Sequence, residues 1–310
     1  MINVTIMSKK IIGCILLAAL FCLLISTVSF AEDDPDQNQY AAVSKNCRLA
    51  VIKNKAGIYL QDETEAEILE KVGFGKKLVP QGRRGDWYQI SYKEQTAYIR
   101  QEDVVCYNRK KKHIALTYDD GPRTVSTGKI LDVLEKYNFR ATFFVVGENV
   151  GKKTAKVLKR EKALGCEIGN HSYSHPKYTG ISDSSIRKQL SDTDSRVKKI
   201  TGGKPSLGRA PYGAVSSRVL RVMKRPNIMW TVDTLDWKYR NKSRLVRVVK
   251  ADAGDGKIVL MHDIHDSTAA AAEKICKNLK KAGYEAVTVT ELAAIKGKSL
   301  KGKQSYNSFR

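Results

Sequence analysis

Two patterns of apolar and polar residues divide this chain of 310 residues. The first covers residues 47–106, where short runs rich in aromatic and β-branched residues follow one another, as in WYQISY (87–92) and TAYIR (96–100). Runs of this length and composition, with turn residues between some of them, are typical of β-strands. The first pattern therefore predicts a small all-β barrel.

The second pattern begins at residue 111, where apolar runs alternate with amphipathic helical segments. The apolar runs predict strands at residues 113–118, 141–147, 166–170, 207–210, 228–233, 257–262 and 285–289. Strands that alternate with helices predict an α/β fold. We expect a distorted or incomplete β/α barrel, the catalytic domain, over residues 111–296. The basic tail of residues 297–310 is expected to be frayed.

The N-terminal segment has the pattern of an export signal. Two lysines precede the apolar run of residues 11–28, and the small residues Ser29 and Ala31 occupy the positions that a signal peptidase needs. We predict a signal peptide over residues 1–31, with an uncleaved N-terminal membrane anchor as the alternative. The polar residues 32–46 are predicted to be a linker. The protein is therefore expected to be secreted or held in the cell envelope, and to contact a membrane only if the N-terminal segment is retained.

The charge balance indicates the kind of partner. The whole chain carries a net charge of +23; without the two lysines of the signal, 53 basic and 32 acidic residues leave +21. A basic excess of this size favours polyanions. For an exported protein we expect anionic wall polymers to bind the basic surface. The chain has no nucleic-acid-binding motif, so nucleic acid is not an expected partner.

Export also affects the interpretation of the cysteines. Two of the six lie in the predicted signal, and the other four form no C-x-x-C pair, so a cysteine zinc site is not expected. Cys47 and Cys106 stand at the two ends of the all-β segment. Outside the cell a disulfide between them is one prediction. Four buried thiols are the alternative.

Carboxylates and imidazoles gather where the predicted strands of the α/β segment end. They occur in five short segments: TYDDGP (117–122), HSYSH (171–175), RAPYG (209–213), DTLDW (233–237) and LMHD (260–263). In β/α barrels, chemistry gathers at the carboxyl ends of the strands. We therefore expect these five segments to meet in one site.

The residue types in these segments suit a metal-dependent hydrolase. Two imidazoles and one carboxylate leave a fourth position on a metal ion open for water. We predict that His171, His175 and Asp120 are the metal ligands. Asp119 then stays unligated and can accept a proton from water. Zinc suits this ligand set, with cobalt or manganese as alternatives.

A second group must protonate the leaving atom. We predict that His262 is this general acid and that Asp236 orients it. Arg209 is expected to hold Asp119 as the base. Backbone N–H groups in the turn of residues 210–213 are expected to complete an oxyanion site.

The five segments, in this order, closely resemble the motifs of the NodB-homology polysaccharide deacetylases (carbohydrate esterase family 4) over residues 111–295. The resemblance implies metal-dependent removal of N-acetyl groups from peptidoglycan or chitin, or of O-acetyl groups from xylan. It implies the same roles for the residues above. It also implies that the Tyr212 backbone N–H joins the oxyanion hole and that Trp237 and Leu260 line the acetyl pocket. Tyr118 and Ala210 replace the usual phenylalanine and proline.

A second resemblance concerns the all-β segment. GDWYQISYKEQTAYI (85–99) is similar to bacterial SH3-like wall-associated domains, and TLDWKYRN (234–241) is similar to the N-acetylglucosamine branch of the deacetylases. Together with export and positive charge, these features favour a peptidoglycan N-acetylglucosamine deacetylase. The alternatives are a chitin-oligosaccharide or xylan deacetylase, a muramic acid deacetylase, and a non-catalytic wall-binding protein.

Overall fold

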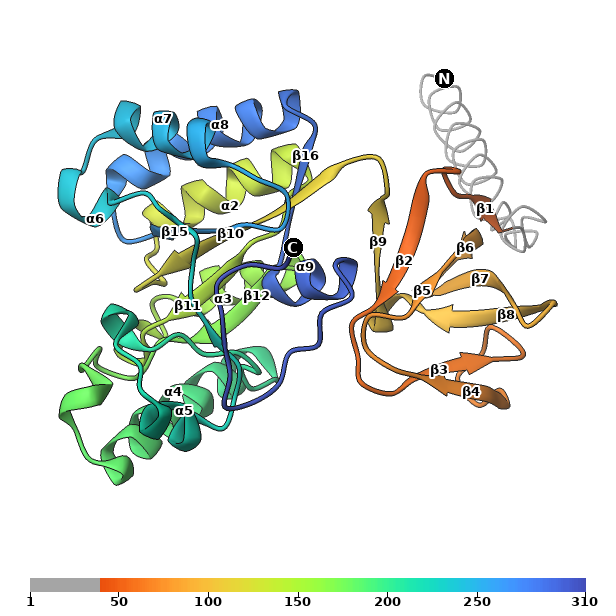
Figure 1. Ribbon diagram of the computed structural model, residues 1–310, viewed down its shortest axis with the longest axis horizontal. Helices are drawn as coiled ribbons and strands as arrows, with labels where there is room; N and C mark the ends of the chain where they lie inside the picture. Colours follow the sequence, from red (N-terminus) through yellow and green to blue (C-terminus); the bar gives the residue numbers. More distant parts are fainter. Residues whose placement is uncertain (1–39) are drawn as a thin grey trace, which may run out of the picture. The chain divides into compact units, whose positions relative to one another are not determined.

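The computed structural model describes residues 40–310, shown as a ribbon in Figure 1. The predicted signal peptide or anchor of residues 1–31 and the first part of the predicted linker lie outside the described residues. Within residues 40–310, no helix has both the length and the apolar composition needed to cross a membrane. The described elements form a β-rich segment followed by an α/β segment.

The first segment is all-β, as its residue pattern predicts. Its elements are β1 (Ala41–Ala42), β2 (Cys47–Val51), β3 (Ala56–Tyr59), β4 (Ile68–Val72), β5 (Lys77–Leu78), β6 (Pro80–Arg84), β7 (Trp87–Tyr92), β8 (Gln95–Arg100), the 3-10 helix η2 (Gln101–Asp103) and β9 (Val104–Asn108). Strands β6, β7, β8, β3 and β4 form one antiparallel sheet in that order, and β5, β2 and β9 form another. In β7, Tyr88, Ile90 and Tyr92 are buried and Ser91 is exposed, so alternate residues face the core. The SH3-like character of residues 47–106 stays a prediction.

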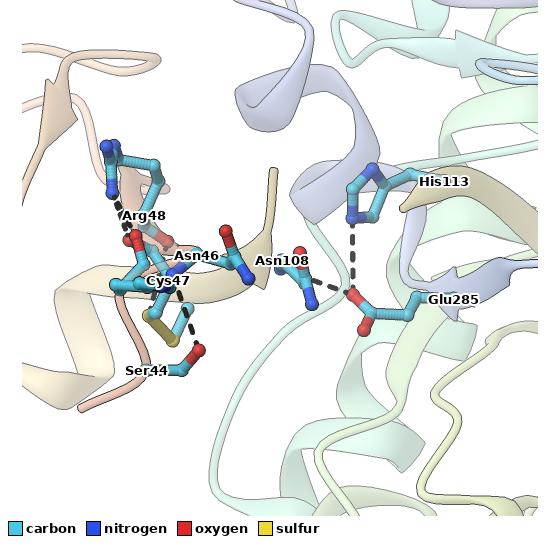
Figure 2. The surroundings of a disulfide bond; sticks show 9 residues. Ser44, Asn46, Cys47, Arg48, Asn108, His113 and Glu285 are labelled. Atoms are coloured by element: carbon cyan, nitrogen blue, oxygen red, sulfur yellow. Dashed lines mark hydrogen bonds and ion pairs between the residues drawn. A yellow bond between two sulfur atoms is a disulfide. The ribbon is translucent and has the colours of Figure 1, made fainter. Parts of the chain in front are cut away.

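A disulfide joins the two ends of this segment, as Figure 2 shows. Cys47 in β2 and Cys106 in β9 have Cα atoms 6.2 Å apart, within the range that disulfides span. The two strands also pair with each other in antiparallel register. The predicted Cys47–Cys106 bridge is confirmed. Cys166 and Cys276, which also belong to the described residues, are buried free thiols.

Parallel strands form the centre of the α/β segment. The strands are β10 (Lys112–Asp119), β11 (Thr142–Val145), β12 (Glu167–Asn170), β13 (Asn227–Ile228), β14 (Val232–Asp233), β15 (Ile258–His262), β16 (Tyr284–Val287) and β17 (Ser305–Tyr306). Pairing runs in the order β12, β11, β10, β15 and β14, and β16 also pairs with β10. Single bridges from Asn170 to Gly208 and from Gly208 to Asn227 continue the ring to β13. This is a distorted β/α barrel.

Helices connect and cover these strands. They are α2 (Ser126–Tyr137), α3 (Ala155–Ala163), α4 (Asp183–Thr201), α5 (Ser217–Met223), α6 (Asp236–Tyr239), α7 (Lys242–Asp252), α8 (Asp266–Lys281) and α9 (Val289–Ile295), with the 3-10 turns η3 (Gly147–Asn149), η4 (Tyr178–Gly180) and η5 (Pro211–Gly213). Helices α2 and α7 each pack on α8, along one side of β10 and β15 (Figure 1). Leu116, Phe143 and Met261 belong to the buried core beneath them.

Two predicted strands are less regular than their sequences suggest. The strand predicted at residues 207–210 is reduced to bridges at Gly208, and the one predicted at residues 228–233 is broken into β13 and β14. The buried side chain of Arg209 explains part of this break. Its Nε donates to the carbonyl of Ile228 (2.8 Å) and its Nη2 to that of Met229 (3.2 Å). These contacts engage backbone acceptors that a continuous sheet would otherwise use.

The C-terminal tail is ordered, which corrects the expectation of fraying. Strand β17 pairs in parallel with β13, and the backbone N–H of Phe309 donates to the carbonyl of Gly256 (2.8 Å). The Phe309 side chain is only 2% exposed and packs in a core cluster with Ile228 and Ile258. A single aromatic residue near the end of a basic segment therefore anchors the tail.

Candidate active site

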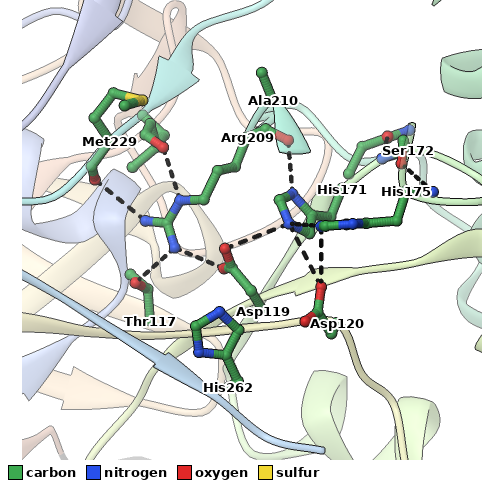
Figure 3. Close-up of polar contacts among 12 residues, drawn as sticks. Thr117, Asp119, Asp120, His171, Ser172, His175, Arg209, Ala210, Met229 and His262 are labelled. Atoms are coloured by element: carbon green, nitrogen blue, oxygen red, sulfur yellow. Dashed lines mark hydrogen bonds and ion pairs between the residues drawn. The ribbon is translucent and has the colours of Figure 1, made fainter. Parts of the chain in front are cut away.

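Side chains that can bind metal or move protons gather at the carboxyl ends of the parallel strands. β10 ends at Asp119, β12 ends one residue before His171, and β15 ends at His262. The register of β10 and β15 places Asp119 beside His262. Residues that are far apart in sequence thus begin from neighbouring positions, and Figure 3 shows them converging.

Asp120, His171 and His175 form a possible metal site. One ligand atom from each lies within 4.8 Å of the others. The Nε2 atoms of the two histidines are 3.2 Å apart. Asp120 Oδ1 is 3.6 Å from Nε2 of His171 and 3.4 Å from Nε2 of His175. Nitrogen and oxygen ligands about 2.1 Å from a tetrahedral metal ion lie about 3.4 Å from one another, so the spacing fits.

The hydrogen bonds of these ligands also fit a metal ion. His171 Nδ1 donates to the carbonyl of Arg209 (2.7 Å), which leaves a lone pair on Nε2 facing the other two ligands. Burial, only partly offset by the charge of Asp120, lowers the pKa of His171 to about 3, so the ring is neutral. Asp120 Oδ1 is buried and accepts no hydrogen bond from any described residue. A buried oxygen rarely lacks a partner, and a cation would supply one.

Asp119 lies beside the three ligands and is held by a buried arginine. Arg209 is fully buried; its Nη1 donates to Asp119 Oδ1 (2.6 Å) and to Thr117 Oγ1 (2.9 Å). The other carboxylate oxygen of Asp119 is 3.5 Å from Nε2 of His171. Burial raises the pKa of Asp119, although the positive charges of Arg209 and His262 oppose the rise. One carboxylate oxygen is thus fixed, while the other faces the ligand cluster.

His262 and Asp236 form the second acid–base pair. Asp236 Oδ1 is 2.8 Å from His262 Nδ1, and Asp236 Oδ2 accepts from the His262 backbone N–H (2.8 Å) and from Thr268 Oγ1 (2.7 Å). Burial lowers the pKa of His262, but the hydrogen bond and charge of Asp236, with the charges of Asp119 and Asp120, raise it to about 9. His262 is therefore protonated at neutral pH and can donate a proton.

These groups line one cavity of about 350 Å³. The lining residues are Asp119, Asp120, His171, His175, Tyr212, Gly213, Trp230, Asp233, Trp237, Leu260 and His262. Tyr212 and Trp237 are 68% and 48% exposed at the cavity, and Leu260 is buried. The ring of Tyr212 lies 4.5 Å from that of His175. The cavity thus has polar groups from several strand ends and an aromatic rim.

The structure brings all the predicted site residues together: most line the cavity, and the others lie behind them. Eight of the ten line the cavity; Arg209 and Asp236 do not line it and contact it through Asp119 and His262. Trp230 and Asp233 also line the cavity, although the sequence motifs did not predict this. Trp230 lies in a predicted strand, where a large aromatic residue usually indicates core packing.

Asp263 shapes the site in a way that the sequence motifs did not predict. Its backbone N–H donates to the carbonyl of Asp119 (3.3 Å), and its carboxylate accepts from Thr127 Oγ1 (2.5 Å). The carboxylate packs so closely on Gly121 that a side chain at residue 121 would overlap it. Burial raises the pKa of Asp263 to about 7. Asp263 therefore braces the loop that carries Asp120, and its position next to His262 was the available signal.

Comparison with known proteins agrees with this geometry. A family model described as polysaccharide deacetylase matches residues 107–229. The peptidoglycan-N-acetylglucosamine deacetylase of Bacillus cereus is 34% identical over 216 residues, which cover 67% of this chain and 76% of that protein. The chain belongs to the polysaccharide deacetylase family. The NodB-homology resemblance stated from the five motifs is thereby confirmed.

Other relatives of this chain are longer proteins. The peptidoglycan-N-acetylmuramic acid deacetylase PdaC of Bacillus subtilis is 42% identical over 66% of this chain and 43% of its own length. The peptidoglycan-N-acetylglucosamine deacetylase PgdA of Listeria monocytogenes is 45% identical over 59% of this chain and 39% of its own length. The chain thus spans less than half the length of these two relatives.

Solved structures share the catalytic fold. The structure of PdaC from Bacillus subtilis superimposes with a TM-score of 0.60 at 44% identity, covering 61% of this chain and 94% of that chain. A family 4 acetyl xylan esterase from Clostridium thermocellum, solved with a cobalt ion, gives a TM-score of 0.61 at 36% identity and covers 64% of this chain and 98% of its own. The β/α-barrel character of the catalytic segment is thereby confirmed.

Proposed function

We propose that this polysaccharide deacetylase hydrolyses N-acetyl groups of N-acetylglucosamine in peptidoglycan. The observation that carries the proposal is the convergence of three units on one cavity: the triad Asp120, His171 and His175, the pair Asp119–Arg209, and the pair His262–Asp236. This set provides metal ligands, a base and an acid, which is what amide hydrolysis requires.

Asp120, His171 and His175 would hold a divalent metal ion, which we propose to be zinc, with cobalt or manganese as alternatives. When bound, the ion supplies Lewis-acid activation of the acetyl carbonyl and of water. Hydrogen bonds within the chain orient two of the three metal ligands. The carbonyl of Arg209 holds the Nδ1 proton of His171, and the backbone carbonyl of Asp120 accepts a hydrogen bond from Asn149 Nδ2 (2.7 Å).

Asp119 acts as the general base in this proposal. Arg209 fixes one of its oxygens, so the other is available at the cavity to take a proton from the attacking water. Because burial raises the pKa of Asp119, the carboxylate is a stronger base than an exposed aspartate. The positive charge of Arg209 opposes this rise and favours the ionised form.

His262 acts as the general acid and protonates the departing amine. Its proton is held at neutral pH because Asp236 stabilises the charged ring. Asp236 binds Nδ1, so the proton on Nε2 is the one available for transfer. The Tyr212 backbone N–H would stabilise the oxyanion, and Trp237 and Leu260 would enclose the acetyl methyl.

The segments outside the cavity suggest where the enzyme works. The SH3-like character proposed for residues 47–106 suits wall association, and the predicted export signal suits the same place. The relatives named as peptidoglycan deacetylases support an extracytoplasmic location and a wall substrate. The net charge of +23 favours attachment to anionic wall polymers.

A second candidate is deacetylation of N-acetylmuramic acid. It is favoured by the 42% identity to PdaC of Bacillus subtilis, which is named as a deacetylase of that sugar. The two candidates share one site and differ in which sugar of the same glycan lies over the metal. Mass spectrometry of the product sugars distinguishes them by locating the free amine.

Acetate release tests the proposal. The protein is stripped of metal, reloaded with zinc and incubated with peptidoglycan, chitin oligomers and acetylxylan, beside the variants Asp119→Asn and His171→Ala. We expect zinc-dependent release from peptidoglycan that both substitutions abolish. Asp252→Asn, an exposed carboxylate at the end of α7, serves as the matched control and should retain activity. Release only from chitin oligomers or acetylxylan would contradict the substrate, and no release with zinc bound would support the non-catalytic wall-binding alternative.

A further inference from the structure

A group of cations next to the cavity has no assigned role in the mechanism. We name it the α6 shelf and define it as Lys238, Tyr239, Arg240 and Arg244. It follows directly in sequence from Trp237, which lines the cavity, and Lys238, Tyr239 and Arg240 are exposed. Arg240 Nε donates to the carbonyl of Trp237 (2.7 Å), which joins the shelf to the cavity wall.

The shelf holds its charges in fixed places. The guanidinium of Arg244 lies 4.0 Å from the ring centre of Tyr239, and Lys238 Nζ lies 5.3 Å from the same centre. Stacking of this kind orients a cation while leaving its outward N–H groups available. Arg240 donates to His265 Nδ1, which keeps its side chain next to α8. Two cations are thus ordered around one aromatic ring, and the third is held by its contacts with Trp237 and His265.

These positive charges lack carboxylate partners among residues 40–310. No ion pair formed by the described residues includes Lys238, Arg240 or Arg244. Arg244 Nε is buried and, over the described part of the chain, has no hydrogen-bond partner. Asp236, the nearest acid in sequence, is 2% exposed and already paired with His262. The shelf therefore presents net positive charge beside the place where the substrate enters.

We infer that the α6 shelf binds carboxylates carried by the glycan, namely those of the peptide stems attached to the sugars beside the reacting one. The inference rests on the proposed function and specifies its substrate class: a peptide-bearing, anionic glycan rather than a neutral one. A glycan lying across the cavity extends past Trp237, and acidic groups on it meet Lys238 and Arg244. Chitin oligomers carry no carboxylates, so the α6 shelf does not increase their binding affinity.

The test measures binding separately from catalysis. Peptidoglycan fragments with free stem-peptide carboxylates are compared with the same fragments after those carboxylates have been converted to amides. Affinities are measured with Asp119→Asn and, as a second form, with the metal-free native chain. Because each exposed charge pair contributes modestly, we expect native fragments to bind about fivefold more tightly than amidated ones at low salt. The preference should fade when ionic strength rises to about 1 M, where the Debye length is about 3 Å.

Variants locate the effect. Lys238→Gln combined with Arg244→Gln should remove most of the preference for native fragments. Lys250→Gln removes one positive charge from an exposed position about 9 Å farther along α7 than Arg244 and should leave the preference in place. The single variant Lys238→Gln, at an exposed side chain, provides an intermediate preference if the double variant folds poorly.

Three results would overturn the inference: equal affinity for native and amidated fragments, a double variant that keeps the full preference, or a control variant that loses as much. The last would mean that diffuse charge over the whole surface is responsible. Failure of the proposed function is recognised differently, as a lack of acetate release from either fragment by the zinc-loaded native chain. The binding comparison keeps its meaning in that case.

Discussion

Replacing Asp236 by asparagine should shift the pH range in which the proposed acid works. The substitution keeps the shape of the side chain and removes the negative charge that lies 2.8 Å from His262 Nδ1. The difference between the ordinary histidine pKa of 6.5 and the pKa of about 9 for His262 corresponds to about 3 kcal/mol of stabilisation of the charged ring. His262 is 13% exposed, so solvent screens this interaction little.

The expected loss of activity depends strongly on pH. With the pKa of His262 near 9, about nine tenths of the molecules hold the proton at pH 8. Without Asp236 the pKa of His262 should return toward the ordinary 6.5, because burial lowers it and only the charges of Asp119 and Asp120 still raise it. At a pKa of about 6.5, about 3% of the molecules hold the proton at pH 8. We expect about thirtyfold lower kcat/KM at pH 8, with recovery toward the native value near pH 5.5.

The assay measures acetate release at a series of pH values. At each pH the kcat/KM of the variant is divided by that of the native protein, so that the titration of Asp119, which both share, cancels. Thr268→Val is the matched control, because it removes a hydrogen bond to Asp236 (2.7 Å) and keeps the charge. In Thr268→Val, the fall of kcat/KM at high pH (the alkaline limb of the pH profile) should occur near the same pH as in the native protein. A loss in Asp236→Asn that is the same at every pH, or an alkaline limb that does not move, would refute the reasoning.

Three further predictions concern stability. Because the pKa of His262 is raised, its contribution to the free energy of unfolding is fully present below about pH 6.5 and is lost as pH rises through about 9. Urea unfolding at several pH values should show this decline in the free energy of unfolding. A decline of the same size in Asp236→Asn would contradict the prediction. Replacing both Cys47 and Cys106 by alanine opens a loop closed over 59 residues and should cost about 2–4 kcal/mol in denaturant unfolding, whereas an unchanged midpoint would count against the bridge. Phe309→Ala empties a buried site and should cost about 3–5 kcal/mol by the same assay; a loss below about 1 kcal/mol would show that the tail is not anchored there.

Local pattern was sufficient to predict the elements of the fold. The alternation of Tyr88, Ile90 and Tyr92 with polar neighbours predicts a strand with one buried face, and the structure has it as β7. The switch to alternating apolar runs and helices at residue 111 predicts the β/α barrel. Such patterns work because each strand or helix must bury one side, and that requirement is present in the local sequence.

Local pattern was insufficient where a distant group competes for the backbone. The irregular segment between β13 and β14 depends on Arg209, whose side chain takes the carbonyls of Ile228 and Met229. The ordered tail depends on the site that receives Phe309. Neither partner is near in sequence, so no window of neighbouring residues contains the information.

For the candidate site, the sequence by itself determined the identity of the groups. The order of the five motifs selected Asp119, Asp120, His171, His175, Arg209, Tyr212, Asp236, Trp237, Leu260 and His262. Only the tertiary structure decided how these groups differ from one another. Although both are histidines at strand ends, burial lowers the pKa of His171 to about 3, whereas Asp236 outweighs the effect of burial and raises the pKa of His262 to about 9. The physical reason is that a charge senses every group packed around it, and packing exists only once the chain has folded.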